Sequence, residues 1–190
     1  MNKLLIFIII LIIIIYLNYY SKYNKKFEII QLTSDKINQD ILHEKLPILI
    51  EDPISNVNDF IYVLLTYEYA FKKDHKYTKN NFSNKVNENL AYHLIIYNSN
   101  ENTIPIYISH PKFSKKFKFN KNNSFYYRIS DYEVDDEEDI NDTQFVKINI
   151  KPKQLLILPS YWLFYLNTNA DMYFLYGIFN SLISFSKICI

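Results

Sequence analysis

The chain has 190 residues, of which 17% are aromatic, and its formal net charge is +1. Four of its 21 basic residues precede Phe27, so 17 basic residues face 20 acidic ones from there on, which excludes the charge pattern of a nucleic-acid-binding protein. The aromatic content supports a packed core and excludes general disorder. The chain has only one cysteine, Cys189, and one glycine, Gly177. These counts exclude a disulfide framework and a glycine-rich phosphate loop.

The first element in chain order is an apolar run from Leu4 to Leu17, which holds no charged or strongly polar side chain. A helix over Leu4–Tyr20 would be about 25 Å long, close to the thickness of a bilayer's hydrocarbon core. Basic residues follow the run at Lys22, Lys25 and Lys26. The sequence therefore predicts a single-pass N-terminal transmembrane helix, a membrane localisation and a lipid bilayer as partner. Residues 1–26 form the anchor with its basic collar, and residues 27–190 form one globular domain.

A cleaved signal peptide and a buried core helix are the two alternatives for this run. A cleavage site needs small residues, whereas the chain reads Leu-Asn-Tyr-Tyr-Ser over residues 17–21. A core helix is disfavoured at a terminus with charges on both sides and no polar face. Lysines on both sides leave open the side of the membrane on which the domain lies.

The domain begins with a mixture of strands and helices. The predicted elements are a strand over 27–32, a helix over 34–46, a strand over 47–51 and a helix over 59–72. Residues 75–89 are polar and predict a loop. Short aromatic and β-branched runs then predict strands over 92–97, 104–109, 125–129, 145–150, 154–158, 163–167 and 172–178. Two short helices followed by antiparallel strands indicate an α+β fold. The tail over 179–190 is compatible with a strand or a helix.

Three segments carry a family resemblance: Leu-Pro-Ile-Leu-Ile-Glu at 46–51, Ile-Tyr-Ile-Ser-His-Pro at 106–111, and Gln-Leu-Leu-Ile-Leu-Pro-Ser-Tyr-Trp-Leu-Phe-Tyr at 154–165. Together they resemble the cupin-like, jumonji-C-related proteins, and membrane-tethered forms are similar to proteins of giant DNA viruses. The most specific part is the corner motif formed by Pro159, Tyr161, Trp162 and Phe164. The resemblance implies an antiparallel double-stranded β-helix, the cupin-like barrel.

Active proteins of that kind hold Fe(II) with a His-x-Asp/Glu pair and a distal histidine, beside oxoglutarate. Phe164 occupies the position of the distal histidine, and a phenyl ring cannot ligate a metal. Residues 84–89, where the pair is expected, contain no histidine. We therefore expect no catalytic, metal-binding or cofactor-binding residue. The expected function is that of a membrane-anchored, catalytically inactive cupin-like domain, a structural or interaction module that can bind other proteins.

Two further functions stay open. An oxygenase with non-standard ligands could rebuild a metal site from Glu88, His93 and His110. A small-ligand-binding cupin could line the old cofactor cavity with the aromatic residues Tyr92, Tyr107, Trp162 and Tyr165. The acidic segment 131–142 has neither the glycine nor the spacing of a calcium loop, which favours a solvated loop.

Overall fold

The computed structural model describes residues 3–21, 23–67, 73–80, 84–120, 126–134 and 144–177. Its helices are α1 (Lys3–Ser21), α2 (Gln39–His43) and α3 (Val57–Thr66), with 3₁₀ turns η1 (Ser34–Lys36) and η2 (Pro111–Lys116). The strands are β1 (Ile30–Leu32), β2 (Ile48–Ile50), β3 (Lys73–Asn80), β4 (Lys85–Asn89), β5 (His93–Tyr97), β6 (Ile104–Ser109), β7 (Tyr127–Glu133), β8 (Val146–Ile150), β9 (Leu155–Pro159), β10 (Leu163–Tyr165) and β11 (Ala170–Gly177). The predicted α+β class is confirmed.

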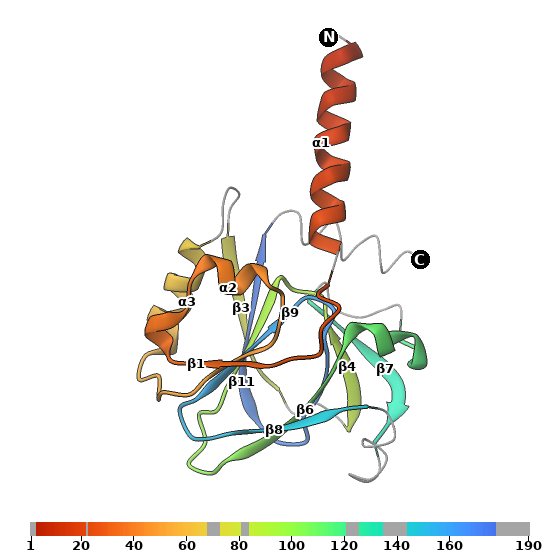
Figure 1. The fold of residues 1–190 in the computed structure, drawn as a ribbon. Coiled ribbons are helices and arrows are strands. Elements are labelled where there is room, and N and C mark those ends of the chain that lie inside the picture. Colours follow the sequence, from red (N-terminus) through yellow and green to blue (C-terminus); the bar gives the residue numbers. More distant parts are fainter. Residues whose placement is uncertain are drawn as a thin grey trace.

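The strands form two sheets that face each other (Figure 1). The six-stranded sheet has the order β1-β2-β9-β5-β11-β3, and the five-stranded sheet has the order β7-β4-β10-β6-β8. From β3 to β6, and again from β8 to β11, the chain crosses from one sheet to the other at every connection. All strand pairs are antiparallel except β1 with β2.

The main core lies between the two sheets. Successive side chains of a strand point to opposite faces, so every second residue contributes to this core. In β9, Leu156 and Leu158 point inward, while Leu155 and Ile157 point outward. Both faces of the six-stranded sheet are covered, which is why the whole of β9 is buried and reads as a continuous apolar run.

Two smaller clusters cover the outer faces. Leu42 of α2 and Phe60, Ile61 and Leu64 of α3 pack on the six-stranded sheet. The helix α3 begins where Asn56 accepts hydrogen bonds from the first turn. On the outer face of the five-stranded sheet, Phe117, Val134 and Phe145 cover the aliphatic and aromatic side chains of Val86, Tyr107, Leu163 and Tyr165.

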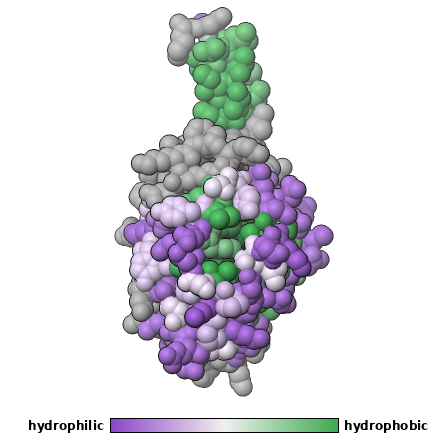
Figure 2. All heavy atoms as spheres, turned by 90° about the vertical axis from the view of Figure 1, so that its left-hand side faces the viewer, coloured by the Kyte–Doolittle hydropathy of each residue, from purple (hydrophilic) through white to green (hydrophobic). Residues whose placement is uncertain are grey.

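The predicted transmembrane anchor is wrong. Within the part of the chain that the structure describes, no helix is both long enough and apolar enough to cross a bilayer. The apolar run Leu4–Leu17 gives the physical reason, because 14 residues of helix span only about 21 Å of a hydrocarbon core of about 30 Å. The predicted membrane localisation is corrected with it. Figure 2 shows α1 as an apolar column that stands clear of the domain.

Several predicted elements have different bounds in the structure. The segment 75–89, predicted as a loop, forms most of β3 and all of β4. The helix predicted over 34–46 is split into η1 and the short α2, which begins at the capping residue Asn38. The predicted strand over 125–129 is displaced to β7. The tail over 179–190, with Cys189, and the basic residue Lys22 lie outside the described residues.

Candidate functional site

The corner between β9 and β10 is held by hydrogen bonds from β4. Tyr161 has φ 73°, a left-handed conformation that is uncommon for a bulky residue. Its backbone N–H donates to the carbonyl oxygen of Asn89 at 2.6 Å. The Asn89 side-chain amide in turn donates to the carbonyl oxygens of Leu158 and Pro159, both at 3.0 Å. The fully buried Asn89 therefore fixes the turn that Pro159 begins.

Asn87 and Phe164 lie directly opposite each other in β4 and β10. Phe164 belongs to the main core, and residues directly opposite in antiparallel strands share a face, so Asn87 faces the space between the sheets. Both side chains are fully buried. The Asn87 amide nitrogen donates to the carbonyl of Lys85, but its Oδ1 atom has no hydrogen-bond partner among the described residues. The sequence does not reveal this inward-facing asparagine, because the residues around it are polar and predict a loop.

Aromatic rings from the N-terminal segment close the end of the domain where this pair lies. The ring centroid of Phe27 lies 5.7 Å from that of Trp162, which is fully buried. Tyr23 meets the ring of His110 edge-on at 5.3 Å, and His110 meets Trp162 edge-on at the same distance. Phe27 also packs on the main core. The chain segment after α1 therefore fills the mouth between the sheets with aromatic side chains.

His110 has a structural role at this end of the domain, because it is hydrogen-bonded to the backbone on both sides of its ring. Its Nε2 atom is 2.7 Å from the carbonyl oxygen of Asn24, and its Nδ1 atom accepts a hydrogen bond from the backbone N–H of Lys112. These contacts fix the neutral tautomer that carries its proton on Nε2. Burial lowers the pKa of His110, and the charge of Lys112 lowers it further. Hydrogen bonds to the backbone of residues 24 and 26 raise the pKa and offset part of this effect.

Glu88 points the other way from Asn87. It lies opposite Leu163, whose side chain belongs to the cluster on the outer face of the five-stranded sheet. There its carboxylate accepts hydrogen bonds from Nε, at 2.7 Å, and from Nη2 of Arg128. The Arg128 guanidinium also lies over the ring of Phe119, 4.8 Å from its centroid. The carboxylate is thus committed to a buried ion pair, since Glu88 is fully buried.

His93 lies on the outer face of the six-stranded sheet. It is paired with Leu175, which packs in the cluster beneath α2 and α3. Burial, followed by the charges of His43 and Lys45, lowers its pKa to about 3. Its ring meets that of Tyr92 edge-on at 4.4 Å. His93 is therefore neutral at physiological pH.

The structure does not bring Glu88, His93 and His110 together. Two of them lie on the outer faces of different sheets, and the third caps η2 at the mouth. In the described part of the chain, no group of three histidine, cysteine or acidic side chains could hold a metal ion. Of the aromatic residues proposed to line a cofactor cavity, Trp162 packs in the main core, whereas Tyr107 and Tyr165 face outward.

The acidic segment is only partly described. Its first residues end β7, where Glu133 forms an ion pair of 3.0 Å with Lys85. The backbone N–H of Asp131 donates to the carbonyl of Lys118. Residues 135–142 lie outside the described residues.

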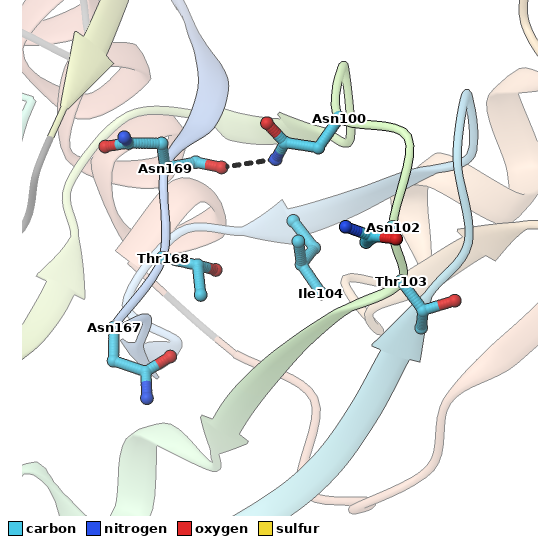
Figure 3. Close-up of a pocket in the computed structure, with 7 residues that line it drawn as sticks. All are labelled: Asn100, Asn102, Thr103, Ile104, Asn167, Thr168 and Asn169. Carbon is cyan, nitrogen blue, oxygen red and sulfur yellow. Dashed lines mark hydrogen bonds between the residues drawn. The ribbon is translucent and has the colours of Figure 1, made fainter.

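A pocket of about 650 Å³ lies between two loops, one joining β5 to β6 and the other joining β10 to β11 (Figure 3). The corner at Pro159 is paired with the first residue of β5, so the pocket lies at the opposite end of that strand. Its lining residues are Asn100, Asn102, Thr103, Ile104, Asn167, Thr168 and Asn169. The sequence carries no signal for this pocket, because asparagine in a loop is ordinarily a turn residue.

A scan against models of known protein families and a search of curated proteins both returned no match for this chain.

Proposed function

We propose that this protein is a catalytically inactive cupin-like domain that acts as a structural or interaction module. The observation that carries the proposal is the pair formed by Asn87 and Phe164, which face each other across β4 and β10. The corner motif that resembles the cupin-like family places Phe164 where its active proteins have the distal histidine. Asn87 and Asn89 then occupy the positions of a His-x-Asp pair on the neighbouring strand.

The strand order supports the assignment to this fold. Apart from β1, β2 and β7, eight strands form the two sheets, and the chain crosses between the sheets at most connections. This is the arrangement of the double-sheet jelly rolls to which the cupins belong. The strands β1 and β2 extend one sheet, and β7 extends the other.

The side chains at the assigned positions argue against metal chemistry. A phenyl ring offers no lone pair, and a neutral amide is a much weaker ligand for Fe(II) than imidazole or carboxylate. The Asn89 amide is in addition fully engaged with the corner, through Leu158, Pro159 and the backbone N–H of Ala91. The mouth through which a substrate would enter is filled by Phe27 and Trp162.

The test has two steps. The purified chain is first loaded with Fe(II) in the absence of air and its bound iron is measured, and oxoglutarate and air are then admitted and the oxoglutarate consumed is measured. We expect neither stoichiometric iron nor turnover. One iron per chain together with oxoglutarate consumption would establish the rival function, an oxygenase with non-standard ligands.

A matched variant tests the assigned positions themselves. Asn87→His combined with Asn89→Asp and Phe164→His would place two imidazoles and one carboxylate where the resemblance requires them. A folded triple variant is expected to bind Fe(II), whereas the natural chain is expected not to. If it folds, as judged by circular dichroism, and binds none, the assignment of the three positions is wrong.

A further inference from the structure

The pocket at the far end of β5 is lined by uncharged residues, nearly all of them polar. The lining consists of four asparagines, two threonines and one isoleucine, and none of these seven residues carries an ionisable group. Amides and hydroxyls both donate and accept hydrogen bonds. A charged ligand would find no counter-charge in this lining, whereas a neutral ligand rich in hydroxyl groups would find partners for donors and acceptors alike.

Several of these polar groups are available. The amides of Asn102 and Asn167 form no hydrogen bond with another described residue, and Figure 3 shows them on opposite sides of the pocket. The Thr168 hydroxyl oxygen is buried and lacks a partner within the described part of the chain. A buried hydroxyl without a hydrogen-bond partner is destabilising, and a rotation about the Cα–Cβ bond of Thr168 can turn the hydroxyl toward a ligand.

The pocket is also held in shape before any ligand arrives. The fully buried Asn98 donates from its amide to the carbonyl oxygens of Asn102 and Ile150, both at 2.8 Å, and accepts from the backbone N–H of Asn100. The side chain of Asn100 then donates to the carbonyl of Asn169 at 2.8 Å, which joins the two loops (Figure 3). A preformed site loses less conformational entropy on binding than a flexible one.

One wall of the pocket is apolar. The side chain of Ile104 lies between the two loops, facing Thr168 (Figure 3). Sugar rings present apolar C–H faces as well as hydroxyl groups, so a polar rim with one aliphatic wall suits them. The volume of about 650 Å³ lies within the range of about 300–1,000 Å³ that is usual for small-molecule sites.

From these observations we infer that the pocket between the β5–β6 and β10–β11 loops binds a neutral carbohydrate of about the size of a disaccharide. This inference goes beyond the proposed function, because it concerns the other end of the domain and holds whether or not the barrel binds iron.

The test is titration of the full ¹⁵N-labelled chain with maltose, cellobiose, lactose and N,N′-diacetylchitobiose, followed through the side-chain amide signals of asparagine. At least one of these sugars is expected to give saturable shifts at Asn100, Asn102, Asn167 and Asn169. Glucose 6-phosphate, which carries a charge, and a neutral dipeptide amide are expected to bind at least tenfold more weakly.

Three variants sharpen the test. Thr168→Val keeps the shape and removes the hydroxyl, and Asn167→Ala removes an exposed amide with little risk to folding. Each is expected to raise Kd about tenfold, the effect of losing roughly one hydrogen bond. Asn58→Ala, on the exposed side of α3, is the matched control and should leave Kd unchanged. The inference is overturned if no sugar saturates the signals, if neither pocket variant weakens binding, or if the phosphate or the peptide binds as well as the best sugar.

Discussion

Glu88 and Arg128 face each other directly in β4 and β7, and the guanidinium donates to a single carboxylate oxygen from both Nε and Nη2. The carboxylate is fully buried, whereas the Arg128 side chain is 18% exposed. Removing the arginine would take the counter-charge away from a buried carboxylate, which is more costly than replacing both members of the pair.

For this pair we predict that Arg128→Ala lowers the free energy of unfolding by about 3–5 kcal/mol, and that Glu88→Leu with Arg128→Leu costs much less. Urea denaturation of both variants measures the difference. The more exposed pair of Lys85 and Glu133, whose side chains are 29% and 64% exposed, provides the control, because Lys85→Ala should cost at most about 1 kcal/mol. Equal losses in the single and the double variant would show that the buried charge is not the source of the cost.

The lowered pKa of His93 predicts that the domain loses stability in mild acid. Its pKa is about 3 in the folded state, because burial and the charges of His43 and Lys45 disfavour the proton, whereas its ordinary value is 6.5. Between these values the unfolded chain binds a proton that the folded chain does not. The free energy of unfolding should therefore fall as the pH drops below about 6.5, by up to about 1.4 kcal/mol per pH unit from this residue.

The measurement is chemical denaturation at pH 7, 6 and 5 for the natural chain and for His93→Gln. The variant should show a shallower loss of stability over this range, whatever its stability at pH 7. The same slope in both proteins would mean that His93 takes up a proton without unfolding the domain.

Phe27 is predicted to seal the mouth around Trp162, which is the chain's sole tryptophan. Phe27→Ala should shift the emission of Trp162 to longer wavelength and admit iodide quenching, since the indole would lose an apolar neighbour. It should also lower stability by about 1–3 kcal/mol. Tyr62→Ala removes an exposed aromatic ring on α3 and should change neither the emission of Trp162 nor its quenching by iodide. Unaltered emission in Phe27→Ala would show that the indole is shielded without the N-terminal segment.

Asn98 is predicted to be the structural centre of the pocket loop. Asn98→Ala removes three side-chain hydrogen bonds and leaves buried backbone groups unpaired, so it should cost about 1–3 kcal/mol. Asn100→Ala, at an exposed position with one side-chain bond, should stay within about 1 kcal/mol. Thermal unfolding of the two variants compares them, and a larger loss for Asn100→Ala would contradict the assignment.

The sequence predicts best those strands that are apolar on both faces and those turns that contain a proline. Leu155–Leu158 and the turn at Pro159 lie close to their predicted places, because few other structures bury four consecutive aliphatic residues and then a proline. By contrast, β3 was predicted as a loop. It is an edge strand with lysines at 73, 76 and 79, and among the described strands it pairs only with β11, so its composition carries little apolar signal.

The candidate site was predictable only in part. The place of Phe164 in the corner motif is readable from the sequence, but the residue opposite it is not, because that residue depends on the register between β4 and β10. Asn87, Asn89 and Asn98 are fully buried polar residues, and in an asparagine-rich chain nothing local distinguishes them from turn residues. Their roles become visible only when strands distant in sequence are paired.

The same long-range pairing sets the order in which the domain can be assembled during synthesis. The strand β2, at residues 48–50, pairs with β9 at residues 155–157, and β5 lies between β9 and β11. A ribosome adding about 5–20 residues per second therefore exposes β2 and β5 for several seconds before their central partner exists. Their apolar faces stay uncovered for that time, so the nascent chain is most prone to aggregation before β9 emerges.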